Sequence, residues 1–298
     1  MQNTEFNPSQ LRRLRFLESV ACWEGFVARQ RVSDAFQVTT NHITKDFAAY
    51  RNLYPDNLTY DISNRIYKAG PDFKPSISNG SPHEYLSLLR LYCESGDTDV
   101  IQGMPGPTAG DIIPTAVGVI DRDIFQLLTR AIKSGNGVKV AYQSMRTSHP
   151  QERVLWPHAF VHNGFRWHVR AFDSVHQAFG DYVLSRLLKA PGSRTSKRDI
   201  QLQKDKPTSA AAEKDTGWNE KVIVDVIPAK TLSTHQQDVI AKEYGMIKST
   251  KGWVWSITLR RCVVNYFLQL HRLDLNETNA RITLDDPSII KEFDFSNS

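Results

Sequence analysis

The chain has 298 residues, of which 40% are hydrophobic and 23% charged, and its net charge is +5. This length predicts roughly two or three domains, and the composition excludes a disordered or fibrous protein. No apolar run reaches the roughly 18–20 residues of a membrane span, and the N-terminus MQNTEFNPSQ does not resemble a signal peptide. We therefore expect a cytoplasmic protein with no membrane contact.

Cysteine and charge patterns narrow the chemistry further. Cys22, Cys93 and Cys262 are far apart and form no CxxC pair, so we expect reduced, buried thiols, with no disulfide, metal site or other cofactor. Residues 137–198 hold ten Lys and Arg against three Asp and Glu, a balance of +7, together with five of the nine His. A polyanionic or phosphate-bearing partner is therefore more strongly expected at this segment than elsewhere in the chain.

Residues 1–75 contain three helix patterns in short succession. Apolar side chains predict one helix over residues 8–23 and a second over 28–36. The hydroxyl of Thr39 or Thr40 can cap a third helix, which Pro55 ends. Its buried stripe consists of Ile43, Phe47, Tyr50 and Tyr54.

Two short helices joined by a tight turn, the second with a polar N-terminal half, have the layout of a helix-turn-helix. Residues 57–63 and 64–70 predict a hairpin in the place of a wing. Hydroxyl and amide groups there can reach base edges and basic groups can reach phosphates, so we favour DNA binding over a small helical protein-interaction domain. The expected DNA-binding residues are Thr39, Thr40, Asn41, Thr44, Lys45, Arg51, Asn64, Arg65 and Lys68.

Residues 76–136 are interpreted as a helical connector. The pattern predicts a helix over residues 83–94, then a loop rich in Gly and Pro from Gly103. A second helix begins at Asp121, which can cap it, and ends at Gly135. We expect this connector to supply spacing and dimer contacts. The inward-facing residues of the second helix are Ile124, Leu127, Leu128 and Ile132.

Residues 137–200 contain four strand-like runs in succession, and Asn163–Gly164 is a hairpin signal between the second and third. In the third run, FRWHVRAFD, alternation sends Phe165, Trp167, Val169 and Ala171 toward the core. The opposite face then carries Arg166, His168 and Arg170 with no acid among them. Such a row predicts an anion-binding surface; a merely basic outer face is the alternative.

These runs resemble a WYL domain, a small Sm-like β-barrel named for a Trp-Tyr-Leu triplet, here Trp167-His168-Val169. The pattern YxS…RxxxPHxxVxxxxRWHVRAF is similar to that of transcriptional regulators found beside phage-defence systems such as BREX and CBASS. The resemblance implies a multidomain α+β protein. Its expected parts are an N-terminal winged helix-turn-helix (1–75), the connector (76–136), a central WYL barrel (137–200) and a C-terminal α+β dimerisation extension (201–298).

The resemblance also implies that the WYL domain senses a negatively charged effector, either a nucleotide or single-stranded nucleic acid. Arginines offer planar donor pairs to phosphate, Tyr142 can stack on a base, and Ser144 can donate to a phosphate oxygen. The candidate ligand-binding residues are Tyr142, Ser144, Arg153, His158, Arg166, His168, Arg170 and Arg186.

Residues 201–298 begin with a polar, charged stretch from Leu202 that is typical of a linker. Beyond it the pattern predicts strand, helix, strand, helix and strand. Trp253 and Trp255 share one strand face, and either anchor the dimer interface that the resemblance implies or belong to the core.

Together these features predict a homodimeric transcriptional regulator, a repressor of a phage-defence operon, whose two winged helices bind an inverted repeat in double-stranded DNA. Effector binding in the WYL domain changes the arrangement of the two winged helices. The alternative is an enzyme that acts on a nucleotide through the basic His/Arg site, although the sequence has no GxSxG and no P-loop. A nucleic-acid-binding adaptor without ligand sensing is a third possibility.

Overall fold

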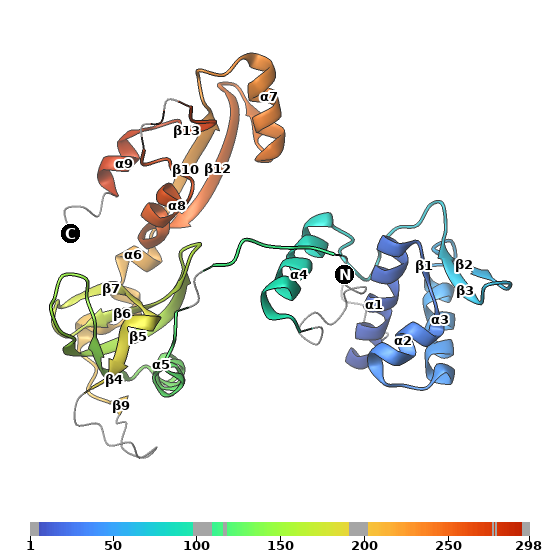
Figure 1. Cartoon of the computed structure of the whole chain (residues 1–298), viewed down its shortest axis with the longest axis horizontal. Helices are drawn as coiled ribbons and strands as arrows, with labels where there is room; N and C mark the ends of the chain where they lie inside the picture. Colours follow the sequence, from blue (N-terminus) through green and yellow to red (C-terminus); the bar gives the residue numbers. More distant parts are fainter. Residues whose placement is uncertain are drawn as a thin grey trace. The chain divides into compact units, whose positions relative to one another are not determined.

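The computed structural model describes residues 6–97, 109–115, 118–190, 202–275, 277 and 279–293. The chain divides into two compact units, Met1–Pro114 and Thr115–Ser298, which Figure 1 colours from blue to green and from green to red. Each unit is described below by itself.

The first unit has the predicted order of helices and hairpin. Its described elements are α1 (Pro8–Glu24), β1 (Phe26–Val27), α2 (Arg29–Phe36), α3 (Thr40–Leu53), β2 (Leu58–Asp61), β3 (Ile66–Ala69) and α4 (Pro82–Ser95). The three strands form a small antiparallel sheet in the order β1-β3-β2. The two-residue strand β1 was not predicted, because so short a run has no periodicity that a sequence pattern could show.

The core of this unit confirms three of the four residues of the predicted apolar stripe of α3; the fourth, Tyr54, is the C-cap and is only half-buried. Ile43, Phe47 and Tyr50 are fully buried and pack with Leu14 and Leu17 of α1. Thr39 caps α3, and the chain leaves the helix at Tyr54, one residue before the proline. The helix therefore presents its other faces, including the polar N-terminal half, to solvent.

The second unit begins with a helix and a six-stranded antiparallel sheet. The elements are α5 (Arg122–Ser134), β4 (Gly137–Tyr142), β5 (Gln151–His162), β6 (Trp167–Asp173), β7 (Ala178–Val183), the 3-10 helix η2 (Leu184–Arg186), β8 (Leu187–Lys189) and β9 (Leu202–Gln203). The predicted hairpin at Asn163–Gly164 is confirmed, with Gly164 at φ 92.

This sheet is open among the described strands. Its order is β7-β6-β5-β4-β8, with β9 also paired to β4, and no pairing joins β7 back to β8. The predicted Sm-like barrel is therefore not confirmed, because closure requires paired first and last strands. Helix α5, which the sequence pattern assigned to the connector, packs on the sheet through Ile124, Leu127 and Leu128.

The C-terminal part of this unit is a second sheet with helices. Its described elements are the 3-10 helices η3 (Thr208–Ala210) and η4 (Ala212–Lys214), α6 (Thr216–Asn219), β10 (Lys221–Pro228), α7 (Thr234–Glu243), β11 (Ile247–Ser249), β12 (Gly252–Arg260), the 3-10 helix η5 (Arg261–Val263), α8 (Val264–Leu270), β13 (Ile282–Leu284) and α9 (Ser288–Glu292). The order β11-β12-β10-β13 with two helical crossovers is that of a ferredoxin-like domain.

The packing answers the question that the sequence left open about Trp253 and Trp255, and it shows that the prediction of a linker from Leu202 is partly wrong. Trp253 and Trp255 are half-buried and pack against the core of this C-terminal domain, and the indole of Trp253 donates to Asp238 at 2.7 Å. The predicted linker is partly ordered against the first sheet, where Ala210 packs with Trp156 and Phe172. Among the described residues, no helix is long and apolar enough to cross a membrane.

Candidate nucleic-acid interface and ligand site

The N-terminal half of α3 presents a polar surface. Thr39 is the N-cap and accepts from the backbone N–H of His42 at 3.4 Å. Thr40, Asn41 and Lys45 are exposed. Thr44 is exposed as well, although its hydroxyl donates to the carbonyl of Thr40 at 2.8 Å. The helix start therefore offers amide, hydroxyl and ammonium groups in adjacent turns.

A buried ion pair holds α3 on α1. Arg13 donates to Asp46 at 2.6 Å, and both side chains are less than one-tenth exposed. Gln10 donates to the same carboxylate at 3.0 Å, and Arg13 also lies 3.0 Å from a ring nitrogen of His42. Sequence reasoning missed this pair, although Asp46 lies next to the apolar stripe, which is an unusual place for an acid.

The wing carries the remaining predicted DNA-binding residues at its surface. Asn64, Arg65 and Lys68 are exposed, and Arg65 has φ 57 in the turn. Lys68 forms an ion pair with Asp61 at 2.7 Å but keeps 55% of its side chain exposed. Hydrogen bonds from Lys68 and Asn64 hold the pKa of Asp61 well below its ordinary value. Because this pair lies on the surface, the Lys68 ammonium stays available to a phosphate.

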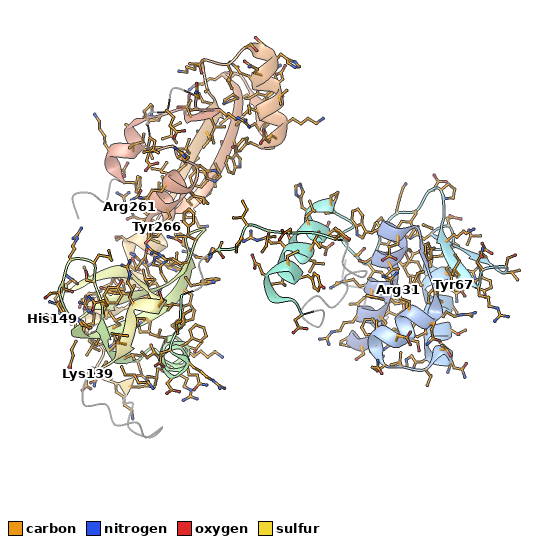
Figure 2. The ribbon with its side chains drawn as sticks, viewed as in Figure 1. Arg31, Tyr67, Lys139, His149, Arg261 and Tyr266 are labelled. Atoms are coloured by element: carbon orange, nitrogen blue, oxygen red, sulfur yellow. The ribbon has the colours of Figure 1, made fainter. Side chains whose placement is uncertain are left out.

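The aromatic rings beneath the wing connect it to α3. Tyr67 on β3 packs against Phe47, with ring centroids 4.3 Å apart, and against Tyr60 at 4.7 Å (Figure 2). The guanidinium of Arg51 lies 5.9 Å from the Tyr67 ring, and Arg51 itself is exposed. Helix and wing therefore pack into one surface that can carry both base-reading and phosphate-binding groups.

Glu18 anchors the segment that follows the wing. Its carboxylate is fully buried and accepts from the Tyr50 hydroxyl at 2.7 Å. It also accepts from three consecutive backbone N–H groups, those of Ser76, Ile77 and Ser78. The carboxylate replaces the backbone partners that this irregular segment lacks.

The eight candidate ligand-binding residues do not form one group; they fall into two clusters and one isolated residue. Near the end of β4, the guanidinium of Arg153 lies 5.4 Å from the Tyr142 ring. The backbone N–H of Gln143 donates to the carbonyl of Arg186 at 3.0 Å, so Ser144, the next residue along the chain, lies close to η2. Tyr142, Ser144, Arg153 and Arg186 thus come from neighbouring elements, and we call them the β4-end cluster.

An internal acid neutralises Arg153 in the β4-end cluster. Its guanidinium donates to Asp173 at 2.7 Å, with both side chains buried, and Tyr182 donates to the same carboxylate at 2.8 Å. Burial alone raises the pKa of Asp173, but the hydrogen bonds it accepts and the charge of Arg153 hold that pKa below its ordinary value. Within the described structure, Nε of Arg153 is buried and has no hydrogen-bond partner.

A second group, the β6 network, surrounds Arg170. Arg170 donates two hydrogen bonds to Asp215 at 2.8 Å and forms an ion pair with Asp181 at 3.1 Å. His158 lies 2.8 Å from Asp215, and Tyr266 on α8 donates to Asp181 at 3.2 Å (Figure 2). The network thus connects β5, β6 and β7 to the segments of the C-terminal domain.

His168 lies beside this network. It is 2% exposed and stacks on Tyr266 with ring centroids 5.4 Å apart. Burial lowers the pKa of His168, which favours the uncharged imidazole at neutral pH. Only Arg166 of the predicted cationic row stays exposed.

The predicted faces of the third run are therefore partly wrong. Val169 and Ala171 are fully buried as expected, but Phe165 and Trp167 are 57% and 52% exposed. The row that was expected to face solvent is buried at His168 and Arg170, because α6 and α8 cover it. Simple alternation assumes one covered face, whereas the middle of β6 is covered on both.

The acid partners of these arginines are what sequence reasoning missed. Asp215 lies 45 residues from Arg170 in a stretch predicted as a linker, so no local pattern could find it. Asp173 and Asp181 carried a signal, because they are two of the three acids in a segment with a balance of +7. Among the described residues, no group of three or more His, Cys, Asp or Glu is placed to hold a metal ion.

The pKa of Asp215 leads to a pH-dependence prediction. Burial alone raises this pKa, but hydrogen bonds from His158 and Arg170 hold it at about 2. The unfolded chain has an aspartate pKa of about 3.9, so the ionised carboxylate stabilises the fold above about pH 4 by up to roughly 2 kcal/mol. That contribution is lost as the pH falls from about 4 to about 2.

Urea unfolding midpoints measured between pH 6 and pH 2.5 test this assignment. The wild type should lose stability more steeply below pH 4 than Asp215→Asn, which has no carboxylate to protonate. Asp205→Asn, at an exposed position of the same polar stretch, should keep the wild-type slope. Equal slopes for the wild type and Asp215→Asn would contradict the assignment.

Comparison with known proteins identifies the class. Residues 9–91 match the model of the BrxR transcriptional regulator winged helix-turn-helix domain, residues 123–191 match the WYL domain, and residues 221–290 match the BrxR C-terminal dimerisation domain. The fold and these matches define a winged-helix regulator with a WYL domain and a dimerisation domain.

Proteins that are similar to this chain over most of its length identify a family within this class. The DNA-binding transcriptional repressor CapW of Stenotrophomonas maltophilia is 32% identical over 80% of this chain and 76% of its own length. CapW of Pseudomonas aeruginosa is 30% identical, and CapW of Escherichia coli (strain KTE188) 29%, each over 91% of this chain and 85% of its own length. The chain belongs to the CapW family of transcriptional repressors. These relatives are DNA-binding transcriptional repressors, which favours the regulator over the enzymatic alternative.

Proposed function

We propose that this protein is a homodimeric repressor that binds an inverted-repeat operator of a phage-defence operon and releases it when an anionic effector binds the WYL domain. The observation that carries the proposal is the exposed polar start of α3, held rigidly on α1 by the Arg13–Asp46 pair. Because the operator is genomic DNA, the protein acts in the cytoplasm.

The first unit supports the DNA-binding half of the proposal. All nine predicted DNA-binding residues are exposed, whereas the apolar side of α3 is fully buried. The polar residues at the helix start are proposed to contact base edges, and Lys45, Arg51, Arg65 and Lys68 to contact phosphates. Two copies present this surface twice, which fits two half-sites of an inverted repeat.

For the effector we propose the β4-end cluster. Arg186 is half-buried, the Tyr142 ring lies under the Arg153 guanidinium, and Nε of Arg153 has no protein partner among the described residues. A phosphate and a stacked base are the chemistry that such a set recognises. His158, His168 and Arg170 are now assigned to the β6 network, and Arg166 to the exposed hairpin. We also begin the effector domain at Asp121, since α5 packs on its sheet.

Replacing Arg186 by alanine should therefore weaken the release of operator DNA that the effector causes. The variant should bind operator DNA as the wild type does, but an effector probe should release it at least about tenfold less effectively, since a charge-assisted contact is lost. The probes are a single-stranded 12-nucleotide DNA and, separately, a nucleoside triphosphate, each titrated into a gel shift. Arg130→Ala, exposed on α5, is the matched control. If release is the same for both variants, the effector does not contact Arg186.

The direct test of the proposed function is a gel shift of the full-length protein with DNA from upstream of its own operon. If the protein–DNA complex persists in the presence of excess shuffled DNA, the result supports the proposed function. If any duplex competes equally well, the result contradicts it.

A further inference from the structure

The sheet of the C-terminal domain has one face that its own helices cover and one that they do not. Val224 and Val226 of β10 point to the covered face and are fully buried in the core with Ile240 of α7 and Leu268 of α8. The alternate residues of β10 point the other way, and Ile223 among them is 63% exposed. We call this second side the outer face.

A row of β-branched side chains crosses the outer face. Ile247 of β11 pairs with Val254 of β12, and Ile227 of β10 pairs with Thr283 of β13. The register between β10 and β12 places Val254 beside Ile227, so the row extends over all four strands. β-Branched side chains in such a row make a flat apolar surface.

A second apolar position lies further along the same strands. Ile223 pairs with Thr258, and between this pair and the row lie Asp225 and Ser256. The Ser256 hydroxyl donates to Asp225 at 2.5 Å, so these two polar groups satisfy one another on the surface. The outer face therefore has apolar groups at both ends and a paired polar centre.

Exposure separates this face from the rest of the domain. Within the described part of residues 202–293, the most exposed large apolar side chains are Ile247 at 76% and Ile223 at 63%. Val239, on the helical side, is 52% exposed. Large apolar groups left in water at both ends of one sheet face indicate an interaction site rather than a random distribution.

We propose that the outer face is the surface through which two copies of this chain dimerise, with the two sheets stacked face to face. Residues 221–290, which match a dimerisation domain, contain all four strands, and the domain's own helices already occupy the other face. A two-fold axis sets the same face against itself, so an apolar–polar–apolar surface is complementary to its own copy. The inference deepens the proposed function, since it rests on the repressor being a dimer.

The test is sedimentation equilibrium of the full chain carrying Ile223→Asp and Ile247→Asp. Each substitution is present twice in a two-fold interface and replaces a buried aliphatic group by a charge. The dimer dissociation constant should therefore rise by at least about a hundredfold. Val239→Asp, at a position on α7 that is also more than half exposed, should leave the dimer unchanged. Thr258→Lys, on β12 opposite Ile223 on the outer face, is a second variant that should weaken the dimer in the same way if the first is shown by circular dichroism to be unfolded.

Two results would overturn the inference. In the first, the outer-face variants dimerise as tightly as the wild type; in the second, Val239→Asp disrupts the dimer and the outer-face substitutions do not. The gel shift separates this failure from failure of the proposed function. If the wild-type protein is a monomer that binds operator DNA specifically, the proposed dimer surface is wrong and the proposed DNA-binding function stands. If the wild-type protein is a dimer that the outer-face variants disrupt, but it binds no DNA specifically, the proposed function is wrong and the proposed dimer surface stands.

Discussion

Replacing Thr40, Asn41 and Lys45 together by alanine should remove specific operator binding while the protein stays folded. All three side chains are exposed on the first two turns of α3, and the cap at Thr39 is kept. A lost base-edge contact costs about 1–3 kcal/mol. Losing the proposed base-edge contacts of Thr40 and Asn41 together with the phosphate contact of Lys45 therefore predicts a loss in affinity of at least about two orders of magnitude. Lys45 contributes in addition to the salt dependence, because a lysine bound to phosphate releases a counterion.

A gel shift with upstream DNA at two salt concentrations measures both effects. The matched control is Thr234→Ala with Lys242→Ala, which removes an exposed hydroxyl and an exposed ammonium from α7 and should not change affinity. Retained specific binding by the triple variant would show that α3 does not read the operator.

Replacing Asp215 by alanine should destabilise the second unit strongly. Arg170 would lose its two 2.8 Å hydrogen bonds while remaining buried, and His158 would lose its carboxylate partner. Removing one member of a buried ion pair costs about 3–5 kcal/mol, because the remaining charge stays desolvated. In a unit of this size, that corresponds to a fall in Tm of roughly 10 °C.

Thermal unfolding followed by circular dichroism tests this expectation, with Arg166→Ala as the control. Arg166 is exposed on the same hairpin, and its loss should change stability by less than about 0.5 kcal/mol. A variant Asp215→Ala as stable as the wild type would show that the β6 network does not hold the C-terminal segments on the sheet.

The winged helix could be predicted from the sequence because local signals specify it. Thr39 as a cap, the stripe from Ile43 to Tyr50 and the stop at Pro55 all act within a few residues, and the structure confirms them. The ladder of the β5–β6 hairpin likewise follows from the two residues Asn163 and Gly164. Where neighbours in sequence decide the structure, pattern reasoning succeeds.

The candidate ligand site could be predicted only in part, because its electrostatics depend on distant residues. Arg170 is one of a basic row by sequence, yet Asp215, 45 residues away, turns it into a structural anchor. Arg153 is similarly paired with Asp173, although its Nε has no hydrogen-bond partner among the described residues. Alternation on β6 failed at Trp167 and His168 because the cover of each face comes from α5, α6 and α8, which no pattern within the strand reports.

The burial and pairing of these arginines separate two roles within the basic segment, residues 137–198. A buried guanidinium paired with two carboxylates holds segments together, whereas a half-buried one such as Arg186 can still meet a ligand. The β6 network therefore connects the sheet that carries the proposed effector site to α6 and α8 of the dimerisation domain. We propose that effector binding biases the arrangement of the two copies through this connection.

A competition gel shift tests most directly whether this protein recognises one operator through α3. Full-length protein bound to labelled DNA from upstream of its operon is challenged with the same duplex or with a shuffled duplex of equal length and composition, at physiological salt. We expect that at least about a thousandfold more shuffled DNA than specific DNA is needed to displace the protein. Equal displacement by the two competitors would contradict it.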